Sequence, residues 1–140
     1  PVNLAARLES QSKNYGVKIV LGPVTAERAS ADGFATLELD LIQVKGQSVG
    51  VSIHCLLGGR DFAARPDFQA LKARHVAFMT DYRGQQWDAA DAGMAECRKM
   101  DAETGIGLDI LYDMYRERID EYRENPPPAD WDGVFVATTK

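Results

Sequence analysis

Three side chains of this sequence are suited to binding phosphate groups, and two of them stand close to its start. Asn3 and Arg7 are four residues apart in the stretch VNLAARLE, so a helix would place them on one face. Arginine offers phosphate oxygens a bidentate fork of donors, and asparagine adds a neutral amide donor. Lys45 stands directly before Gly46 at the end of a predicted strand, where its ammonium group suits a further anion. The set favours phosphoryl or nucleotidyl transfer, in which negative charge develops on phosphate oxygens.

Each of these residues also has an ordinary structural interpretation. Asn3 and Arg7 fit a solvated helix face equally well by spacing. Lys45 fits a charged residue at a hairpin turn. Spacing alone therefore does not establish a site.

The elements that would position these residues follow an α+β order over residues 1–58. Apolar spacing predicts a helix over 3–14 that ends at Gly16, and a β-branched run predicts a strand over 17–21. One or two helical turns follow over 25–30. Period-two alternation then predicts a β-hairpin, with one strand on each side of Gly46-Gln47-Ser48.

Residues 59–140 change period. Apolar side chains recur at spacings of three and four, which predicts three amphipathic helices over 68–82, 87–97 and 108–122. Glycines separate these helices, and Pro126-Pro127-Pro128 ends the last of them. Residues 129–140, with Trp131 and the run Val134-Phe135-Val136, are expected to pack back as an extended tail.

Charge supports a boundary at Gly58-Gly59. The 140 residues carry a net charge of −5. Residues 1–58 hold five basic and five acidic residues, so residues 59–140 hold the whole excess. A pI near 5.0 disfavours nucleic acid as a partner. Cys55 and Cys97 belong to no CxxC pair or Cys/His cluster, which favours a reducing, cytoplasmic compartment and argues against structural zinc.

The ends of the chain suggest a piece of a longer protein. The sequence begins with Pro1 instead of Met, and it contains no charged-then-apolar leader. It also contains no run of 18 or more apolar residues, so we expect no membrane contact from this segment. A membrane anchor in upstream segments of the parent protein stays open.

The N-terminal motifs resemble a known family. The stretch Val2 to Glu9, then Tyr15-Gly16, the strand over 18–21 and Val44-Lys45-Gly46 resemble the C-terminal part of the catalytic domain of class III adenylate/guanylate cyclases. The resemblance covers about residues 1–58 and implies the C-terminal portion of a ferredoxin-like cyclase fold there. The changes of period and charge then predict a three-helix extension over 59–128 and a C-terminal tail over 129–140.

The resemblance also implies an activity and its site residues. The parent would convert ATP to cyclic AMP and pyrophosphate in signal transduction, at sites formed between the subunits of a homodimer. Asn3 would orient the ribose and triphosphate, Arg7 would stabilise the pentavalent phosphorus, and Lys45 would bind the terminal phosphates. Two Mg²⁺ or Mn²⁺ ions would be held by aspartates upstream of residue 1, so these 140 residues alone are expected to be inactive. The choice of ATP over GTP follows family frequency only.

The helical region resembles tetratricopeptide-like repeats through Tyr82, Trp87 and Ala90, over little more than one repeat unit. This leaves an alternative function, in which a non-catalytic cyclase-homology or helical-repeat module acts by protein–protein interaction. Plain aromatic core positions are the structural alternative.

The remaining polar residues have structural interpretations. We expect His75 in the core, and His54 on the polar side of its strand. Asp32 is expected in a loop, and Glu38 and Asp40 on the solvent face of a strand. The alternating acidic and arginine residues of 113–124 predict a solvated helix face with i,i+4 pairs.

Overall fold

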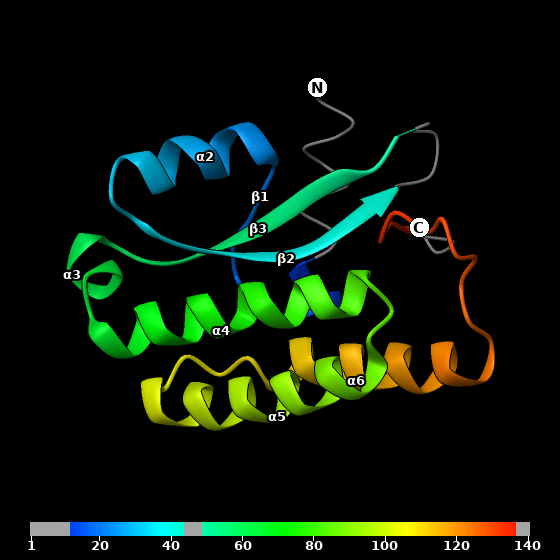
Figure 1. Ribbon diagram of the computed structural model, residues 1–140. Coiled ribbons are helices and arrows are strands. Elements are labelled where there is room, and N and C mark those ends of the chain that lie inside the picture. Colours follow the sequence, from blue (N-terminus) through cyan, green and yellow to red (C-terminus); the bar gives the residue numbers. More distant parts are fainter. Residues whose placement is uncertain (1–11, 44–48, 137–140) are drawn as a thin grey trace. The chain divides into compact units, whose positions relative to one another are not determined.

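The computed structural model describes residues 12–43 and 49–136, and these form an α+β protein (Figure 1). The chain divides into two compact units. The sheet unit comprises residues 1–64 and 134–140, and the helical unit comprises residues 65–133. The division at 64/65 lies a few residues beyond the expected boundary at Gly58-Gly59. The C-terminal residues belong to the sheet unit, so the helical unit is an insertion in it.

The sheet unit begins with a helix end. Residues 12–15 are helical, and Gly16 follows with a φ of 69°, a left-handed value that glycine adopts without strain. The backbone N–H of Val17 donates to the carbonyl of Ser12, which closes the turn at 3.1 Å. The predicted strand over 17–21 is confirmed only for β1, Val20–Leu21.

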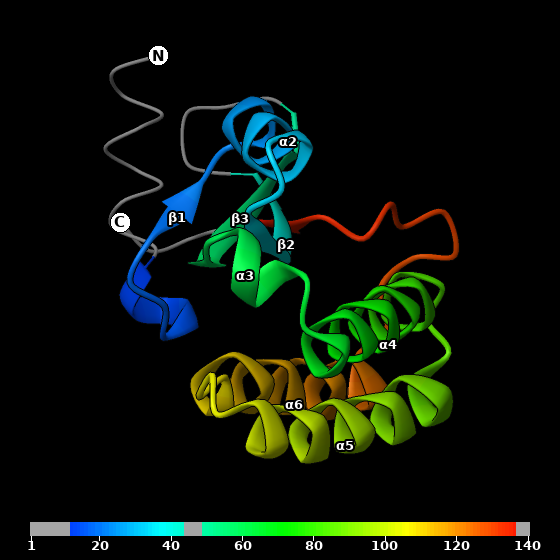
Figure 2. The same ribbon diagram turned by 90° about the vertical axis from the view of Figure 1, so that its left-hand side faces the viewer.

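A helix and two long strands complete the predicted part of this unit. Helix α2, Pro23–Ala31, begins with proline in its first turn, where the missing N–H costs no hydrogen bond. Strands β2, Ala35–Gln43, and β3, Val51–Gly58, pair antiparallel and confirm the hairpin. Figure 2 shows α2 beside these strands, against which it packs. A short helix that the sequence did not predict, α3 (Arg60–Ala63), follows β3.

The sheet has four strands in the order β1-β3-β2-β4. Strand β1 pairs antiparallel with β3, and β4, Phe135–Val136, pairs parallel with the end of β2. The expectation that the tail packs back as an extended segment is therefore confirmed for residues 135–136. Six apolar side chains of the two central strands are at most 1% exposed, and burial of each leucine or isoleucine contributes roughly 1.5–3 kcal/mol. They are Ala35, Leu37, Leu39, Ile42, Ile53 and Cys55.

Asp40 contradicts the sequence prediction. Its side chain is fully buried, with 0% exposure, whereas strict alternation placed it on the solvent face. The pairing of β2 with β3 shifts register between Glu38 and Asp40. Such a bulge adds a residue to one strand and changes the direction of the side chains around it. Glu38 is half-buried, and Asp32 lies exposed at the end of α2 as expected.

The helical unit contains the three predicted helices. They are α4, Pro66–Arg83, α5, Trp87–Thr104, and α6, Asp109–Glu124. Gly84 follows α4, and Gly105 ends α5 with a φ of 76°. The carboxylate of Asp101, itself buried, accepts the N–H groups of Gly107 and Leu108 at 3.0 and 2.8 Å, which satisfies donors at the start of α6.

The core of the helical unit is rich in aromatic rings. Tyr82, Tyr112 and Tyr115 are fully buried, and Tyr82 and Tyr115 meet edge to face with centroids 4.9 Å apart. His75 is fully buried, and its Nδ1 shares a hydrogen bond of 2.9 Å with the Tyr112 hydroxyl. The prediction of a core histidine is confirmed.

After α6, the chain returns to these rings. Trp131 lies against Tyr82 and Tyr122, with centroid separations of 5.5 and 5.2 Å. The side-chain amide of Gln85 donates to the carbonyl of Pro128 at 2.8 Å. Residues 126–131 are thus held on the helical unit by aromatic packing and one hydrogen bond. Among the helices of residues 12–43 and 49–136, none is long and apolar enough to cross a membrane.

Candidate functional site

The three predicted site residues lie outside the described residues. Asn3 and Arg7 fall in 1–11, and Lys45 falls in 44–48. The structure does describe the segments that adjoin them in sequence. These are the helix end at residues 12–15, the end of β2 at Gln43, and the start of β3 at Val51.

A buried hydrogen bond joins the N-terminal helix end to the hairpin. The Tyr15 hydroxyl donates to Asp40 Oδ2 at 2.7 Å, and both side chains are almost completely buried. The backbone N–H of Leu41 donates to Asp40 Oδ1 at 2.8 Å. The carboxylate therefore has hydrogen-bond donors on both oxygens, as a buried carboxylate requires. This contact links the segment that follows Arg7 in sequence to the strand that precedes Lys45.

Sequence reasoning missed this contact. The sequence marks Tyr15 only as part of a motif, and strict alternation places Asp40 on the solvent face. The two residues are 25 positions apart, and no local period relates them. The sequence offers a tyrosine at a helix end and an acidic residue that alternates with leucines in a strand, and neither signal indicates the other as its partner.

The C-terminal segment also contacts the end of β2 and the residue before β3, on either side of residues 44–48. Ile42 pairs with Val51 across the hairpin and with Phe135 on the other side. Gly50 faces Val134, because a Cβ built on Gly50 would lie 2.6 Å from Val134 Cγ2. Residues on both sides of 44–48 therefore contact residues 134–136.

Other groups with chemical potential among the described residues have structural partners. His54 Nε2 lies 3.1 Å from Ser52 Oγ in a half-buried position on β3. No group of three or more His, Cys, Asp or Glu within 12–43 and 49–136 is arranged to hold a metal ion. Burial raises the pKa of the Cys97 thiol to about 11, against opposing effects from Tyr112 and Arg74. A thiol with that pKa stays protonated at neutral pH and is a poor nucleophile.

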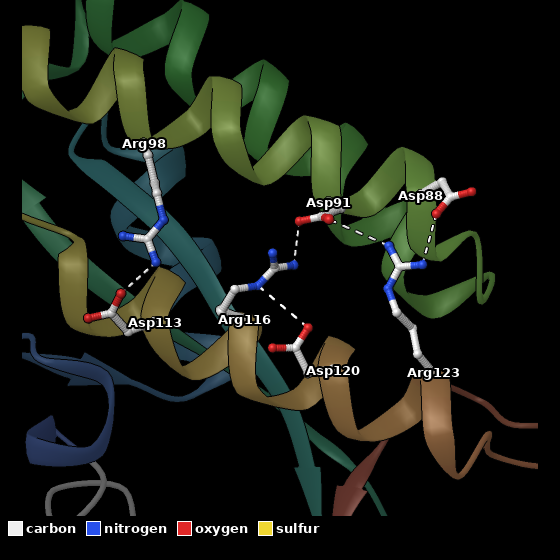
Figure 3. Close-up of polar contacts among 7 residues, drawn as sticks. All are labelled: Asp88, Asp91, Arg98, Asp113, Arg116, Asp120 and Arg123. Carbon is white, nitrogen blue, oxygen red and sulfur yellow. Dashed lines mark hydrogen bonds and ion pairs between the residues drawn. The ribbon is translucent and has the colours of Figure 1, made fainter.

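The charged residues of α5 and α6 meet across the two helices (Figure 3). Arg123 Nη1 contacts Asp88 at 2.8 Å, Arg98 Nη2 contacts Asp113 at 2.5 Å, and Arg116 pairs with Asp91. Successive pairs use residues further along α5 and further back along α6, as two antiparallel helices require. The hydrogen bond that Arg123 donates to Asp88 is the main cause of a raised pKa for the Arg123 guanidinium.

The five acidic residues of 113–124 are exposed, as the expected solvated face requires. The Arg116–Asp120 pair, at 3.9 Å, is the predicted i,i+4 type, but the shorter pairs join different helices. Arg118 is not solvated. It is 8% exposed, its Nη1 lies 3.4 Å from the Tyr82 hydroxyl, and its guanidinium carbon lies 5.3 Å from the Tyr115 ring centroid. Since these arginines already have partners, the face shown in Figure 3 serves helix packing.

Comparison with known proteins gave no match among family models, curated proteins or solved structures. A functional inference therefore depends on the sequence motifs and on the geometry of the described residues. Among the described residues, that geometry includes the buried Tyr15–Asp40 contact, which joins two stretches that adjoin residues 1–11 and 44–48 in sequence.

Proposed function

We propose that this chain belongs to a nucleotidyl cyclase that converts ATP to cyclic AMP and pyrophosphate in intracellular signalling. The observation that carries the proposal is the motif VNLAARLE together with Val44-Lys45-Gly46 at its distance from that motif. The protein acts as a homodimer, and the residues of this chain complete a site whose other half belongs to the second subunit.

The proposed roles follow from the charge that develops in the reaction. The ribose 3′ oxygen attacks the α-phosphate, a new P–O bond forms, and pyrophosphate leaves with the electrons of the broken P–O bond. Arg7 donates to the oxygens of the pentavalent phosphorus, where charge grows. Asn3 orients ribose and triphosphate, and Lys45 binds the terminal phosphates. Mg²⁺ or Mn²⁺ ions would neutralise charge on the phosphates, and aspartates outside these 140 residues would hold them.

Two features of the described structure support this proposal. The Tyr15–Asp40 hydrogen bond ties the helical residues 12–15, which follow Arg7 in sequence, to β2. Strands β2 and β3 are antiparallel neighbours, and Lys45 lies in the sequence that connects them. A rigid support of this kind is what a preorganised charge-stabilising site needs.

The helical unit fits the proposed tetratricopeptide-like extension in its three consecutive helices with short connections. We assign the whole chain to the cytoplasm, where ATP is present and where its two buried free cysteines would stay reduced.

The test uses the parent protein with its upstream half. Arg7→Ala is expected to lower kcat by roughly 10²–10³, as for loss of one preorganised donor, while Arg28→Ala, at an exposed position of α2, leaves kcat unchanged. Mixing Arg7→Ala with a variant lacking an upstream metal-binding aspartate should restore about a quarter of wild-type activity, since mixed dimers hold one intact site.

Near-wild-type turnover of Arg7→Ala would remove Arg7 from the mechanism. If the parent lacks turnover altogether, the interaction module becomes the better proposal. In that case, the compact helical unit of residues 65–133 is the part to examine for protein partners.

A further inference from the structure

A segment that forms neither helix nor strand packs on one end of the helical unit. It comprises residues 126–131, which follow α6 and begin with three consecutive prolines. The end of α4, the start of α5 and the end of α6 lie together at this end of the unit (Figure 1). They contribute the mutually packed rings of Tyr82, Trp87 and Tyr122, which we call the aromatic platform.

Trp131 anchors the segment to the aromatic platform. Its ring centroid lies 5.5 Å from that of Tyr82, 5.2 Å from that of Tyr122 and 6.3 Å from that of Trp87. The contacts with the two tyrosines are edge to face, an arrangement that the quadrupoles of aromatic rings favour. A single side chain of the segment therefore contacts rings from all three helices.

Gln85 supplies the polar part of the contact. Its side-chain amide donates to the carbonyl of Pro128 at 2.8 Å, and the backbone N–H of Trp131 donates to the same carbonyl at 3.0 Å. Within residues 12–43 and 49–136, Gln85 is the one non-glycine residue with a positive φ, 59°. Glycine would adopt this left-handed conformation without strain, directly after a helix end. Backbone strain is thus tolerated at the residue whose side chain binds the segment.

Aromatic packing and a donor to a carbonyl are the contacts by which proteins bind proline-rich segments. Proline fixes φ and has no N–H, so a run of prolines loses little conformational freedom on binding and is recognised through its carbonyl groups and its apolar surface. Residues 126–131 offer both a proline carbonyl and an aromatic anchor. Most of the segment remains exposed, namely Pro126, Pro128, Ala129 and Asp130.

We propose that the aromatic platform and Gln85 bind a proline-rich segment with a following tryptophan from a partner protein, and that residues 126–131 occupy this site until the partner displaces them. The chain's own sequence, PPPADW, defines the chemistry of the ligand. The helices keep their own core when the segment leaves, because Tyr82 also packs on Tyr115. The proposal does not depend on the cyclase function, since every residue involved lies in 65–133.

The chain's own segment competes strongly because it is tethered at both ends. It follows α6 directly, and its other end leads to Gly133, which is buried against the side chain of Arg83. Tethering of this kind gives an effective concentration on the order of 1 mM. A free ligand of the same sequence is therefore expected to bind the wild-type chain only weakly, and more tightly once the internal segment is loosened.

The first experiment adds a fluorescently labelled peptide, ENPPPADWDG (residues 124–133), to the full chain and measures its anisotropy. Trp131→Ala removes the internal anchor. A second variant, with Pro126→Gly, Pro127→Gly and Pro128→Gly together, keeps every ring and gives the internal segment more freedom to leave. Each variant is expected to bind the peptide at least about tenfold more tightly than wild type. Far-UV circular dichroism checks that the helices are retained.

The second experiment tests the contacts in the Trp131→Ala chain. Adding Gln85→Gly should weaken peptide binding by about three- to tenfold, because the amide donor is lost while the backbone conformation is relieved. Gln86→Ala is the matched control, since the amide of Gln86 donates to the carbonyl of Gly84 at 3.3 Å, and it should leave the affinity unchanged. A peptide with alanine in place of its tryptophan should show no saturable binding.

Three results would overturn the proposal. The first is no increase in peptide binding in the variants that retain wild-type helix content. The second is loss of helix in both opened variants, because the segment would then be a structural part of the helical unit. The third is dimerisation of wild type that Trp131→Ala abolishes, measured by sedimentation, because the aromatic platform would then bind a second copy of this chain.

Discussion

Replacing Tyr15 by phenylalanine tests the contact that joins the helix end to the hairpin. The variant removes one hydroxyl and leaves the ring, so packing of the aromatic side chain is retained. Asp40 Oδ2 then loses the donor that lies 2.7 Å away, while Oδ1 keeps the N–H of Leu41. The carboxylate is fully buried, so water does not replace the lost donor without structural opening.

The expected cost follows from that geometry. A hydrogen bond to a charged group contributes roughly 1.5–3 kcal/mol. Since about 1.4 kcal/mol corresponds to a factor of ten, the slowest-exchanging amides of β2 and β3 should exchange roughly 10–100 times faster in Tyr15→Phe. A double-mutant cycle with Asp40→Asn should show that the two changes are not additive.

Native-state hydrogen exchange is the suitable assay, because both tryptophans lie in the helical unit and do not report on the sheet unit. Tyr122→Phe is the control. Its hydroxyl makes no hydrogen bond among the described residues, so a change below about 0.5 kcal/mol is expected. If Tyr15→Phe left the exchange of β2 and β3 within a factor of two of wild type, Tyr15–Asp40 would not be the link that we describe.

Three further predictions concern the helical unit. Trp131→Ala should lower the free energy of unfolding by roughly 2–4 kcal/mol, measured by urea denaturation, and an unchanged value would show that residues 126–131 do not stabilise the helices. Tyr112→Phe should cost about 1 kcal/mol in the same assay by removing the partner of His75, and a loss below about 0.3 kcal/mol would argue against that bond. Cys97, with a pKa of about 11, should resist a thiol reagent at pH 8 until urea unfolds the chain, and rapid labelling of the folded chain would contradict this. The free energy of unfolding should also fall as pH rises from about 9 towards 11, because the thiol ionises at lower pH in the unfolded chain than in the folded one.

The sequence predicted the elements of the fold better than the contacts between them. Hydrophobic periods identified α4, α5, α6 and the β2–β3 hairpin, because amphipathic faces are local in sequence. The burial of Asp40 was not predictable from alternation, since the register shift at Glu38 depends on pairing with β3. The pairing of Arg123 with Asp88 was also missed, because i,i+4 spacing describes a single helix.

The candidate site shows the same limit. Residue type, spacing and resemblance indicate Asn3, Arg7 and Lys45 as site residues, and all three lie outside the described residues. The structure adds two contacts among the described residues, namely the Tyr15–Asp40 hydrogen bond and the packing of Val134 at Gly50. Neither was predictable, because both join residues far apart in the chain through packing that no local pattern encodes.

The most direct test of the proposed function is product formation by the parent protein with Mg²⁺ or Mn²⁺. Wild type is expected to form cyclic AMP and pyrophosphate from ATP in equal amounts, at a rate that Arg7→Ala lowers by roughly 10²–10³. Absence of any cyclic nucleotide from either ATP or GTP, in a folded dimer with both metals supplied, would contradict the account.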